Sequence, residues 1–101
     1  MVIISQKILN EFAKEYPLSA YPLNGWYNQT VAADWQDFNE TKKTFNATDF
    51  VGNNRYVFDI GGNNYRLVAL IHFRKRTLYI RFIGTHKQYE EICKRGLIKT
   101  I

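Results

Sequence analysis

Apolar and polar residues alternate through residues 56–82, and this alternation predicts three consecutive β-strands. Strand side chains alternate between the two faces of a sheet, so the apolar residues share one face, which we expect to be the core. This apolar set is Tyr56, Phe58, Ile60, Leu67, Ala69, Ile71, Phe73, Leu78, Ile80 and Phe82. The polar set on the opposite face is Asp59, Arg66, His72, Arg74, Tyr79 and Arg81.

Two turns connect these three predicted strands. Residues 61–64, Gly-Gly-Asn-Asn, are of the types that tolerate positive φ in a tight hairpin. A second break at residues 74–77 turns the middle strand into the last. The simplest topology is therefore a sheet of sequential antiparallel neighbours.

Helical spacing of apolar positions dominates the first 35 residues. Ser5 is a suitable N-cap for a first helix, and Pro17 ends it. A second helical pattern runs from Leu23 to Trp35. Residues 2–4 form a short β-prone run that we expect at a sheet edge.

The remaining segments have weaker patterns. Residues 36–54 are polar, with a single turn predicted at 41–45 and a loop at 52–54. After Tyr89 the pattern favours a helix up to Arg95, with Gly96 as its stop. We expect one α+β domain spanning residues 1–101, with two N-terminal helices packed on one face of an antiparallel sheet and an open basic opposite face.

Charge is divided unevenly along the chain. Residues 1–50 hold four Lys or Arg and six Asp or Glu, whereas residues 51–101 hold ten and three. The first half therefore carries a net charge of −2 and the second half +7. A basic half on a small domain is typical of proteins that bind a phosphate-rich partner.

Several classes of protein and site are not expected. The N-terminus has no signal-peptide core, and no apolar run is long enough to span a membrane, so we expect a cytoplasmic protein. Cys93 is the only cysteine, which excludes an internal disulfide. His72 and His86 lie too far apart in the chain for a usual metal-ligand spacing, so neither a metal nor another cofactor is expected.

Two groups of basic residues are candidates for phosphate binding. Arg66 and Arg81 are predicted on one face of adjacent strands, where two guanidinium groups can grip a phosphate. The alternative is a solvated sheet face with arginines for solubility. Arg74, Lys75 and Arg76 occupy a turn and suit electrostatic attraction of RNA rather than catalysis.

Three residues after the last predicted strand suit proton transfer. His86, Lys87 and Tyr89 combine a base, a cation and an acid, which is the set that RNA cleavage without a metal requires. The alternative for His86 is an ordinary surface histidine. His72 is more simply a half-buried, hydrogen-bonded histidine, and Tyr79 and Tyr89 offer rings on which RNA bases can stack.

Two sequence elements together resemble the HigB-type toxins of the RelE superfamily. They are Gly-Asn-Asn-Tyr-Arg-Leu at residues 62–67 and Ile-Gly-Thr-His-Lys-Gln-Tyr at residues 83–89. The resemblance is close over residues 56–89 and looser upstream. It departs at Glu90, where many relatives have aspartate, and in the basic tail from Cys93.

The resemblance implies a RelE-like fold and a bacterial toxin that cleaves mRNA, usually on the ribosome, and is held inactive by a cognate antitoxin with a helix-turn-helix domain. The positions that match the family motif, and that it therefore implies as catalytic, are Arg66, Arg81, His86, Lys87 and Tyr89. Further RNA contacts are expected from His72, Arg74, Lys75, Arg76 and Tyr79. The alternatives are a basic RNA- or ribosome-binding protein that does not cleave, or a toxin-like fold kept for binding an antitoxin.

Overall fold

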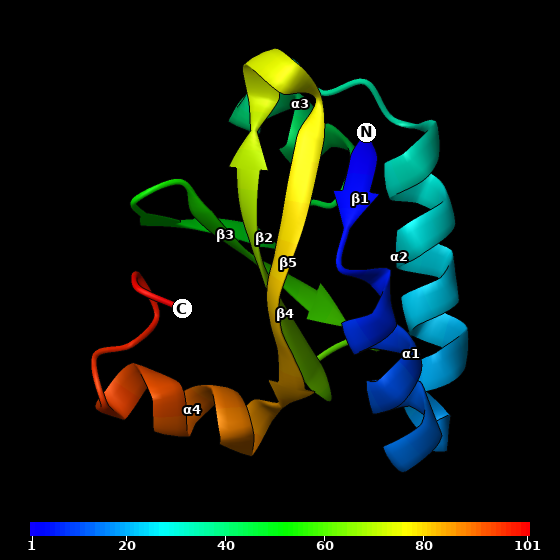
Figure 1. Cartoon of the computed structure of the whole chain (residues 1–101), viewed down its shortest axis with the longest axis vertical. Coiled ribbons are helices and arrows are strands. Elements are labelled where there is room, and N and C mark those ends of the chain that lie inside the picture. The colour runs from blue at the N-terminus through cyan, green and yellow to red at the C-terminus, as the bar shows by residue number, and fades with distance from the viewer.

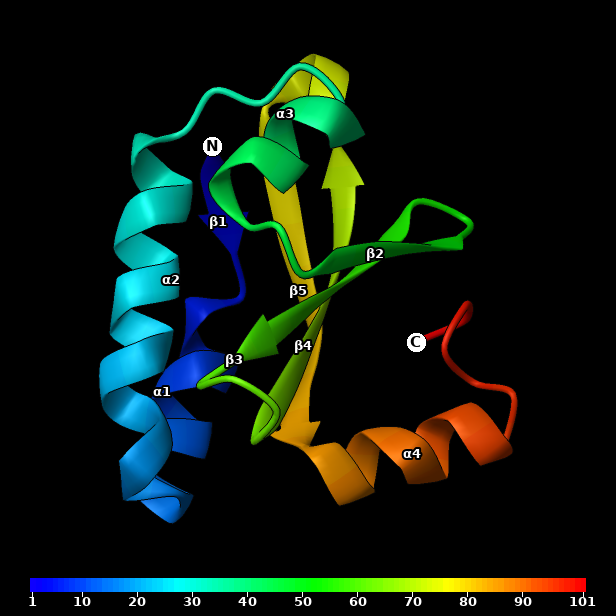
Figure 2. The same ribbon diagram turned by 180° about the vertical axis from the view of Figure 1, so that it is seen from behind.

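The computed structural model describes all 101 residues, which form an α+β fold of four helices and one five-stranded sheet (Figures 1 and 2). In chain order the elements are β1 Val2–Ile4, α1 Gln6–Glu15, α2 Ala20–Ala32, α3 Phe38–Thr44, β2 Thr48–Gly52, β3 Arg55–Ile60, β4 Tyr65–His72, β5 Thr77–Thr85 and α4 His86–Lys94. Short 3₁₀ turns occupy Pro17–Ser19 and Phe73–Lys75. None of the helices has the length and apolar character that crossing a membrane requires.

The sheet has the strand order β1-β5-β4-β3-β2. Strands β2 to β5 are sequential antiparallel neighbours, and β1 pairs with β5 in parallel at one edge. The three predicted strands, their antiparallel order and the edge position of residues 2–4 are confirmed. Strand β2 was not predicted, because Asp49 and Gly52, residue types that are depleted in strands, interrupt its short run of strand-favouring residues.

Both predicted turns are present. Gly61 and Gly62 have φ angles of 61° and 66°, which glycine adopts without steric cost, and they close the β3–β4 hairpin. This turn sets the register in which Asp59 faces Arg66. At the β4–β5 turn Arg76 takes the left-handed conformation, with φ at 51°.

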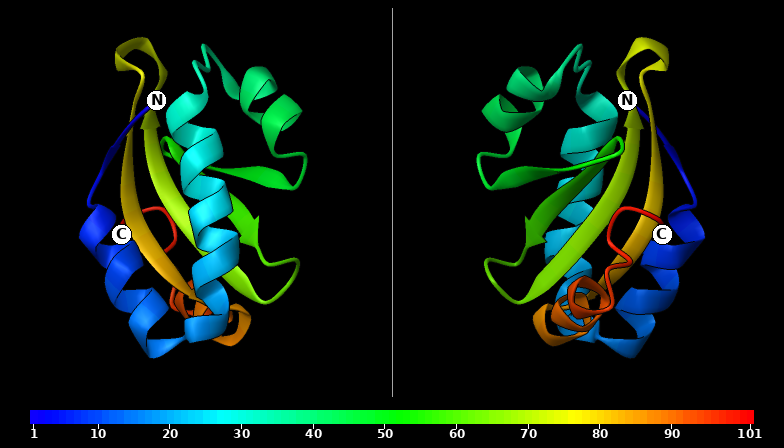
Figure 3. Two further views of the ribbon diagram at one scale, coloured as in Figure 1. Left: turned by 90° about the vertical axis from the view of Figure 1, so that its right-hand side faces the viewer. Right: turned by 90° about the vertical axis from the view of Figure 1, so that its left-hand side faces the viewer.

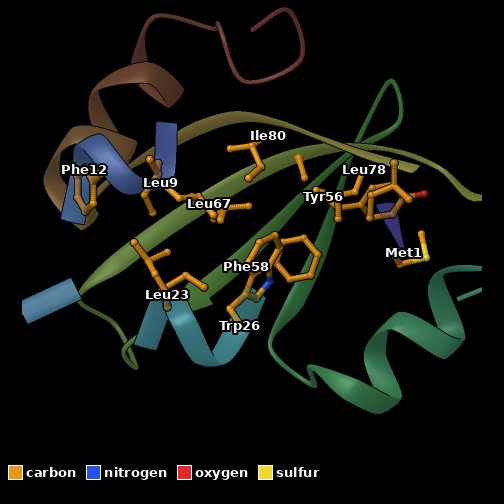
Figure 4. Packing of buried hydrophobic residues seen from close by; sticks show 14 of the residues in the cluster. Met1, Leu9, Phe12, Leu23, Trp26, Tyr56, Phe58, Leu67, Leu78 and Ile80 are labelled. Atoms are coloured by element: carbon orange, nitrogen blue, oxygen red, sulfur yellow. The ribbon is translucent and has the colours of Figure 1, made fainter. Parts of the chain in front are cut away.

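Helices α1 and α2 lie on the same side of the sheet (Figure 3). Leu9 of α1 and Trp26 of α2 belong to one buried cluster with sheet residues such as Phe58, Leu67 and Leu78 (Figure 4). Phe58 is 1% exposed and Leu67 and Leu78 are fully buried, so the cluster is the core of the molecule. The apolar face of the sheet predicted from the alternation is therefore the face that the two helices cover.

The second helix ends earlier than predicted, at Ala32, and Trp35 lies in the connection to α3. Trp35 is 2% exposed, and its indole N–H donates to Thr44 Oγ1 at 2.9 Å. Its ring also packs against Phe45 and Phe58. The prediction that the helix reached Trp35 was wrong because its apolar side chain packs from an extended segment onto α3 and the core, a contact that helical spacing imitates.

A β-bulge in β5 changes which of its residues face the core, so the predicted assignment of β5 side chains to the two faces of the sheet is wrong beyond the bulge. Val68 pairs with Phe82 and Ala69 with Ile80, so Arg81 is an extra residue in the ladder. Beyond the bulge Ile83, rather than Phe82, joins the core. The prediction that Phe82 lies in the core was wrong because the inserted residue reverses the alternation.

The opposite face of the sheet is open only in part. Helix α4 and the C-terminal tail lie on this side, over the lower part of the sheet (Figure 3, right). The tail is held against the β2–β3 hairpin, where the Asn53 amide donates to the Lys99 carbonyl at 2.9 Å. Gly96 has a φ of 70° directly after α4, which confirms the predicted helix and its stop.

Candidate active site at the start of helix α4

Helix α4 begins directly where β5 ends, and a capping box fixes its start. The Thr85 hydroxyl accepts the Gln88 N–H at 3.1 Å, and Gln88 Oε1 accepts the Thr85 N–H at 2.9 Å. The His86 N–H donates to the Asn64 carbonyl at 3.1 Å, which ties the helix to the β3–β4 hairpin. The first helical turn, with His86 and Lys87, therefore has a defined position beside that hairpin.

The His86 imidazole is paired with a carboxylate one turn further along α4. His86 Nε2 lies 2.8 Å from Glu90 Oε1, and both side chains are about half exposed. A carboxylate on one ring nitrogen selects the tautomer that leaves the other nitrogen as the proton acceptor. His86 is thus oriented, accessible and equipped to accept a proton at Nδ1.

Arg66 is held in a network of acceptors. Its Nε lies 3.2 Å from Asp59 Oδ1 across the β3–β4 ladder, and Nη2 donates to Asn63 Oδ1 at 3.0 Å. A second hydrogen bond runs from Nη1 to the carbonyl of Tyr65 at 3.1 Å. The Arg66 side chain is only 10% exposed. A guanidinium has five N–H donors, and these two hydrogen bonds use one each from Nη1 and Nη2.

Tyr89 projects from α4 toward this part of the sheet. Burial, reinforced by Cys93 and Asp49, raises the pKa of Tyr89 to about 12 against the opposing charge of Arg66. Tyr89 therefore lies close enough to Arg66 on β4 and Asp49 on β2 for their charges to affect its pKa. At neutral pH its phenol is protonated and acts as a hydrogen-bond donor.

The chain packs tightly where β5 meets α4. A Cβ atom at Gly84 would lie 2.5 Å from Phe82 Cζ and 2.8 Å from Gln88 Oε1, closer than carbon atoms pack. Glycine is therefore required here for the Phe82 ring and the capping Gln88 to hold their places. A side chain at Gly84 would displace the capping Gln88 and so disturb the start of α4 beside His86.

Arg81 and Lys87 are exposed cations near this site, and neither forms an ion pair. Arg81 occupies the bulge, whereas Arg66 pairs with Gly84 three residues further along β5. At about 3.3 Å per residue, this separation is about 10 Å along the strand. Arg66 and Arg81 are therefore not directly opposite each other in the β4–β5 ladder, and a phosphate held by both would have to lie between their side chains.

The predicted RNA contacts lie toward the other end of the β4–β5 hairpin. His72, Arg74 and Lys75 are exposed at or beside its turn, and Tyr79 is half-buried on β5. Arg76 is committed to an ion pair with Asp34 at 2.7 Å and to the carbonyl of Phe73. The eight residues of β4 separate this turn from the His86 end by about 25 Å, at about 3.3 Å per residue.

Comparison with known proteins identifies the family. Residues 19–92 match the family described as HigB toxin, the RelE-like toxic component of a toxin-antitoxin system. The chain belongs to the HigB toxin family. It is 32% identical to an mRNA interferase HigB of Escherichia coli O6:H1 over 93% of both chains. It is 33% identical to the mRNA interferase toxin HigB of Escherichia coli K12 over 89% of this chain and 88% of the relative.

The HigB family match extends further than the sequence motifs that first indicated it. The motifs lie in residues 56–89, whereas the match at residues 19–92 also takes in α2, α3 and β2. Strand β2 with Asp49, strand β4 with Arg66 and the part of α4 that holds Tyr89 are therefore all within the region that this chain shares with other HigB toxins.

Sequence reasoning missed the partners of the predicted HigB site residues. Asp59 and Asn63, which hold Arg66, could have been found from the hairpin turn, because its length sets their register. Glu90 could have been found from its spacing of four residues from His86 in a helix. No sequence signal placed Asp49 near Tyr89, since β2 was not predicted. The structure holds no cluster of three or more His, Cys, Asp or Glu side chains suited to a metal ion.

Proposed function

We propose that this chain is an mRNA interferase, an endoribonuclease that cleaves mRNA as the toxin of a toxin-antitoxin system. The observation that carries the proposal is its likeness, over about nine-tenths of its length, to proteins named mRNA interferase HigB. The basic second half of the chain, with ten Lys or Arg against three Asp or Glu, suits a polyanionic substrate.

His86 is the proposed proton acceptor. In the proposed reaction the 2′-hydroxyl of one nucleotide attacks the adjacent phosphate, and a base takes its proton. With Nε2–H donating to Glu90, Nδ1 of His86 carries the lone pair that receives this proton. Glu90 is a positioning residue here, because it orients the imidazole and stabilises the imidazolium that forms.

Tyr89 is the proposed donor on the other side of the reaction. Its pKa of about 12 keeps the phenol protonated at neutral pH, so it suits donation to a phosphate oxygen or to the departing 5′-oxygen. The products are one RNA end with a 2′,3′-cyclic phosphate and one with a 5′-hydroxyl.

Cationic side chains stabilise the pentavalent phosphate in this proposal. Arg66 offers the second N–H of Nη1 and of Nη2, and Lys87 adds charge from the first turn of α4. Arg81, about 10 Å along β5 from the partner of Arg66, contacts a neighbouring phosphate instead. Because these side chains supply the positive charge, the proposed reaction uses no metal ion.

The turn residues have a more distant role. Arg74 and Lys75 are too far from His86 to reach the same phosphate, so we assign them long-range attraction of RNA, with His72 and Tyr79 as flanking contacts. Arg76 contributes little because Asp34 neutralises it. We further propose that cleavage takes place on the translating ribosome and that the cognate antitoxin has a helix-turn-helix domain.

Primer extension tests the activity. A reporter transcript is mapped after brief induction of the wild-type chain or of His86→Ala, with translation running or blocked. We expect new 5′ ends with the wild type alone, and their loss when translation is blocked. Growth arrest without new ends would replace this proposal with the RNA-binding protein that does not cleave.

A further inference from the structure

The upper half of the sheet face opposite α1 and α2 carries an apolar strip. Ile3 packs against the core, so its neighbours Val2 and Ile4 point to the opposite face. Val2 is 57% and Ile4 42% exposed. Ile4 pairs with Tyr79, and Tyr79 pairs with Leu70 on the next strand. We call Val2, Ile4, Tyr79 and Leu70 the β1–β5–β4 strip.

The strip is contiguous across three strands. Side chains directly opposite each other on neighbouring strands lie about 5 Å apart, so Ile4, Tyr79 and Leu70 form one row. Single exposed apolar residues are ordinary on a protein surface, but here two exposed ones, Val2 and Ile4, adjoin half-buried Tyr79 and Leu70 to form a patch. In Figure 3 (right), α4 lies lower on the sheet and leaves the start of β1 and the β4–β5 turn uncovered. The C-terminal residue borders the strip at Leu70, because the Ile101 carbonyl accepts from Arg55, the register partner of Leu70, at 2.7 Å.

Unpaired cations lie at both ends of the strip, whereas the anions near it, Asp34 and the C-terminus, lie against Arg76 and Arg55. Strands β1, β4 and β5 contain no Asp or Glu. Arg74 and Lys75 at the turn and Arg81 at the bulge are exposed, and none of the three forms an ion pair. A partner that buries the strip therefore meets unpaired positive charge on both sides of it, which favours acidic residues flanking an apolar stretch.

We propose that the β1–β5–β4 strip binds an acidic, amphipathic segment of the cognate antitoxin. The inference rests on the proposed function for the existence of that partner. Aliphatic Val2, Ile4 and Leu70 give RNA bases no ring on which to stack, and Tyr79 alone is aromatic, so a protein segment fits better than RNA. The strip also reaches the edge strand β1, from which a partner segment can continue past the sheet.

The β1–β5–β4 strip lies far from the proposed catalytic residues at the start of α4. Tyr79 precedes Thr85 by six residues on β5, a distance of about 20 Å at about 3.3 Å per residue. An antitoxin segment on the strip leaves His86 and Tyr89 uncovered. It inhibits by neutralising Arg74, Lys75 and Arg81 and by excluding large RNA assemblies from that face.

Binding of the antitoxin encoded beside the toxin gene tests the inference, measured by calorimetry with purified chains at two salt concentrations. Ile4→Glu removes an apolar side chain from the strip and adds a negative charge that repels the acidic antitoxin segment. We therefore expect the affinity for the antitoxin to fall about 100-fold or more. Ile4→Lys removes the same contact without that repulsion and should cost about tenfold. Leu18→Glu is the matched control, because Leu18 is 87% exposed at the far end of the helical side, and its affinity should stay within about twofold.

Circular dichroism establishes that each variant is folded, and Val2→Glu repeats the test at a second position. If Ile4→Glu and Val2→Glu bound the antitoxin as tightly as the wild type while Leu18→Glu lost affinity, the inference would be overturned and the antitoxin would be placed on the helical side. Strip variants that keep the antitoxin but lose RNA binding would assign the strip to RNA and overturn it as well. A wild-type chain that binds antitoxin through the strip but cuts no RNA would overturn only the proposed function.

Discussion

Arg66 on β4 and Asp59 on β3 form an ion pair across the hairpin, with Nε and Oδ1 3.2 Å apart. The arginine side chain is 10% exposed and the carboxylate 30%, so the pair is largely withdrawn from water. Loss of the guanidinium would leave the Asp59 carboxylate and the Asn63 amide oxygen without their partner. Arg66 therefore holds the hairpin against which α4 begins, in addition to any role toward RNA.

Arg66→Ala and Arg81→Ala should differ in stability even where both reduce cleavage. Breaking the Arg66 pair should lower the free energy of unfolding by about 2 kcal/mol, less than for a fully buried pair because Asp59 is partly solvated. Exposed, unpaired Arg81 should change it by less than about 0.5 kcal/mol. Urea unfolding measures both values, and equal stability of the two variants would contradict the structural role of Arg66.

Glu90→Gln should lower kcat for RNA cleavage by about 10- to 100-fold with little change in KM, because it removes the carboxylate that orients His86. Glu91→Gln is a matched control on the same helix. Glu91 pairs with Arg95 at 3.3 Å with the same spacing of four residues, but not with a proposed catalytic group. Equal kinetics for the two variants would remove Glu90 from the mechanism.

The Tyr89 phenol should titrate near pH 12. The difference in ultraviolet absorbance between the wild type and Tyr89→Phe, followed as the pH is raised, measures this titration. A raised pKa means that the folded chain holds this proton more tightly than the unfolded chain, whose tyrosine titrates near 10. The stability from the neutral phenol is complete below pH 10 and is lost as the pH rises toward 12. Titration of Tyr89 near pH 10 would show that it is exposed and not packed against the sheet.

Gly84→Ala and Gly25→Ala should change stability in opposite directions. The new methyl group at Gly84 would overlap Phe82 and Gln88, which should cost about 1–3 kcal/mol. Gly25 lies within α2 with no atom within 4 Å of a new Cβ, so alanine there should add about 0.5–1 kcal/mol. Thermal or urea unfolding gives both signs. A stable Gly84→Ala with unchanged cleavage would contradict the packing described between β5 and α4.

The sequence pattern was sufficient for the elements whose local signals agree. The glycine-rich turn at 61–64, the alternation in β3 and β4, and Gly96 after α4 each predict what the structure has. The failures come from tertiary contacts that imitate or override those signals. Trp35 has helical spacing but packs from a connection, and Arg81 inserts into a ladder whose alternation continues in the sequence.

The sequence identified the residues of the candidate site but not the side chains that hold them. His86, Lys87 and Tyr89 were identified together, and the helix start keeps them together. The separation of Arg66 and Arg81 along the ladder was not predicted, because the bulge at Arg81 adds one residue to the register of β5. The influence of Asp49 on the Tyr89 pKa depends on how α4 is placed relative to the sheet, which no local pattern encodes.

The chemistry of the RNA ends tests the central claim most directly. Transcripts isolated after induction of the wild type and of His86→Ala are sequenced from their 5′ ends, with and without prior phosphorylation by polynucleotide kinase. Attack by the 2′-hydroxyl leaves 5′-hydroxyl ends, so we expect new ends that are captured only after phosphorylation and are absent with His86→Ala. New ends that carry a 5′-monophosphate, or that persist in His86→Ala, would contradict the mechanism assigned to this site.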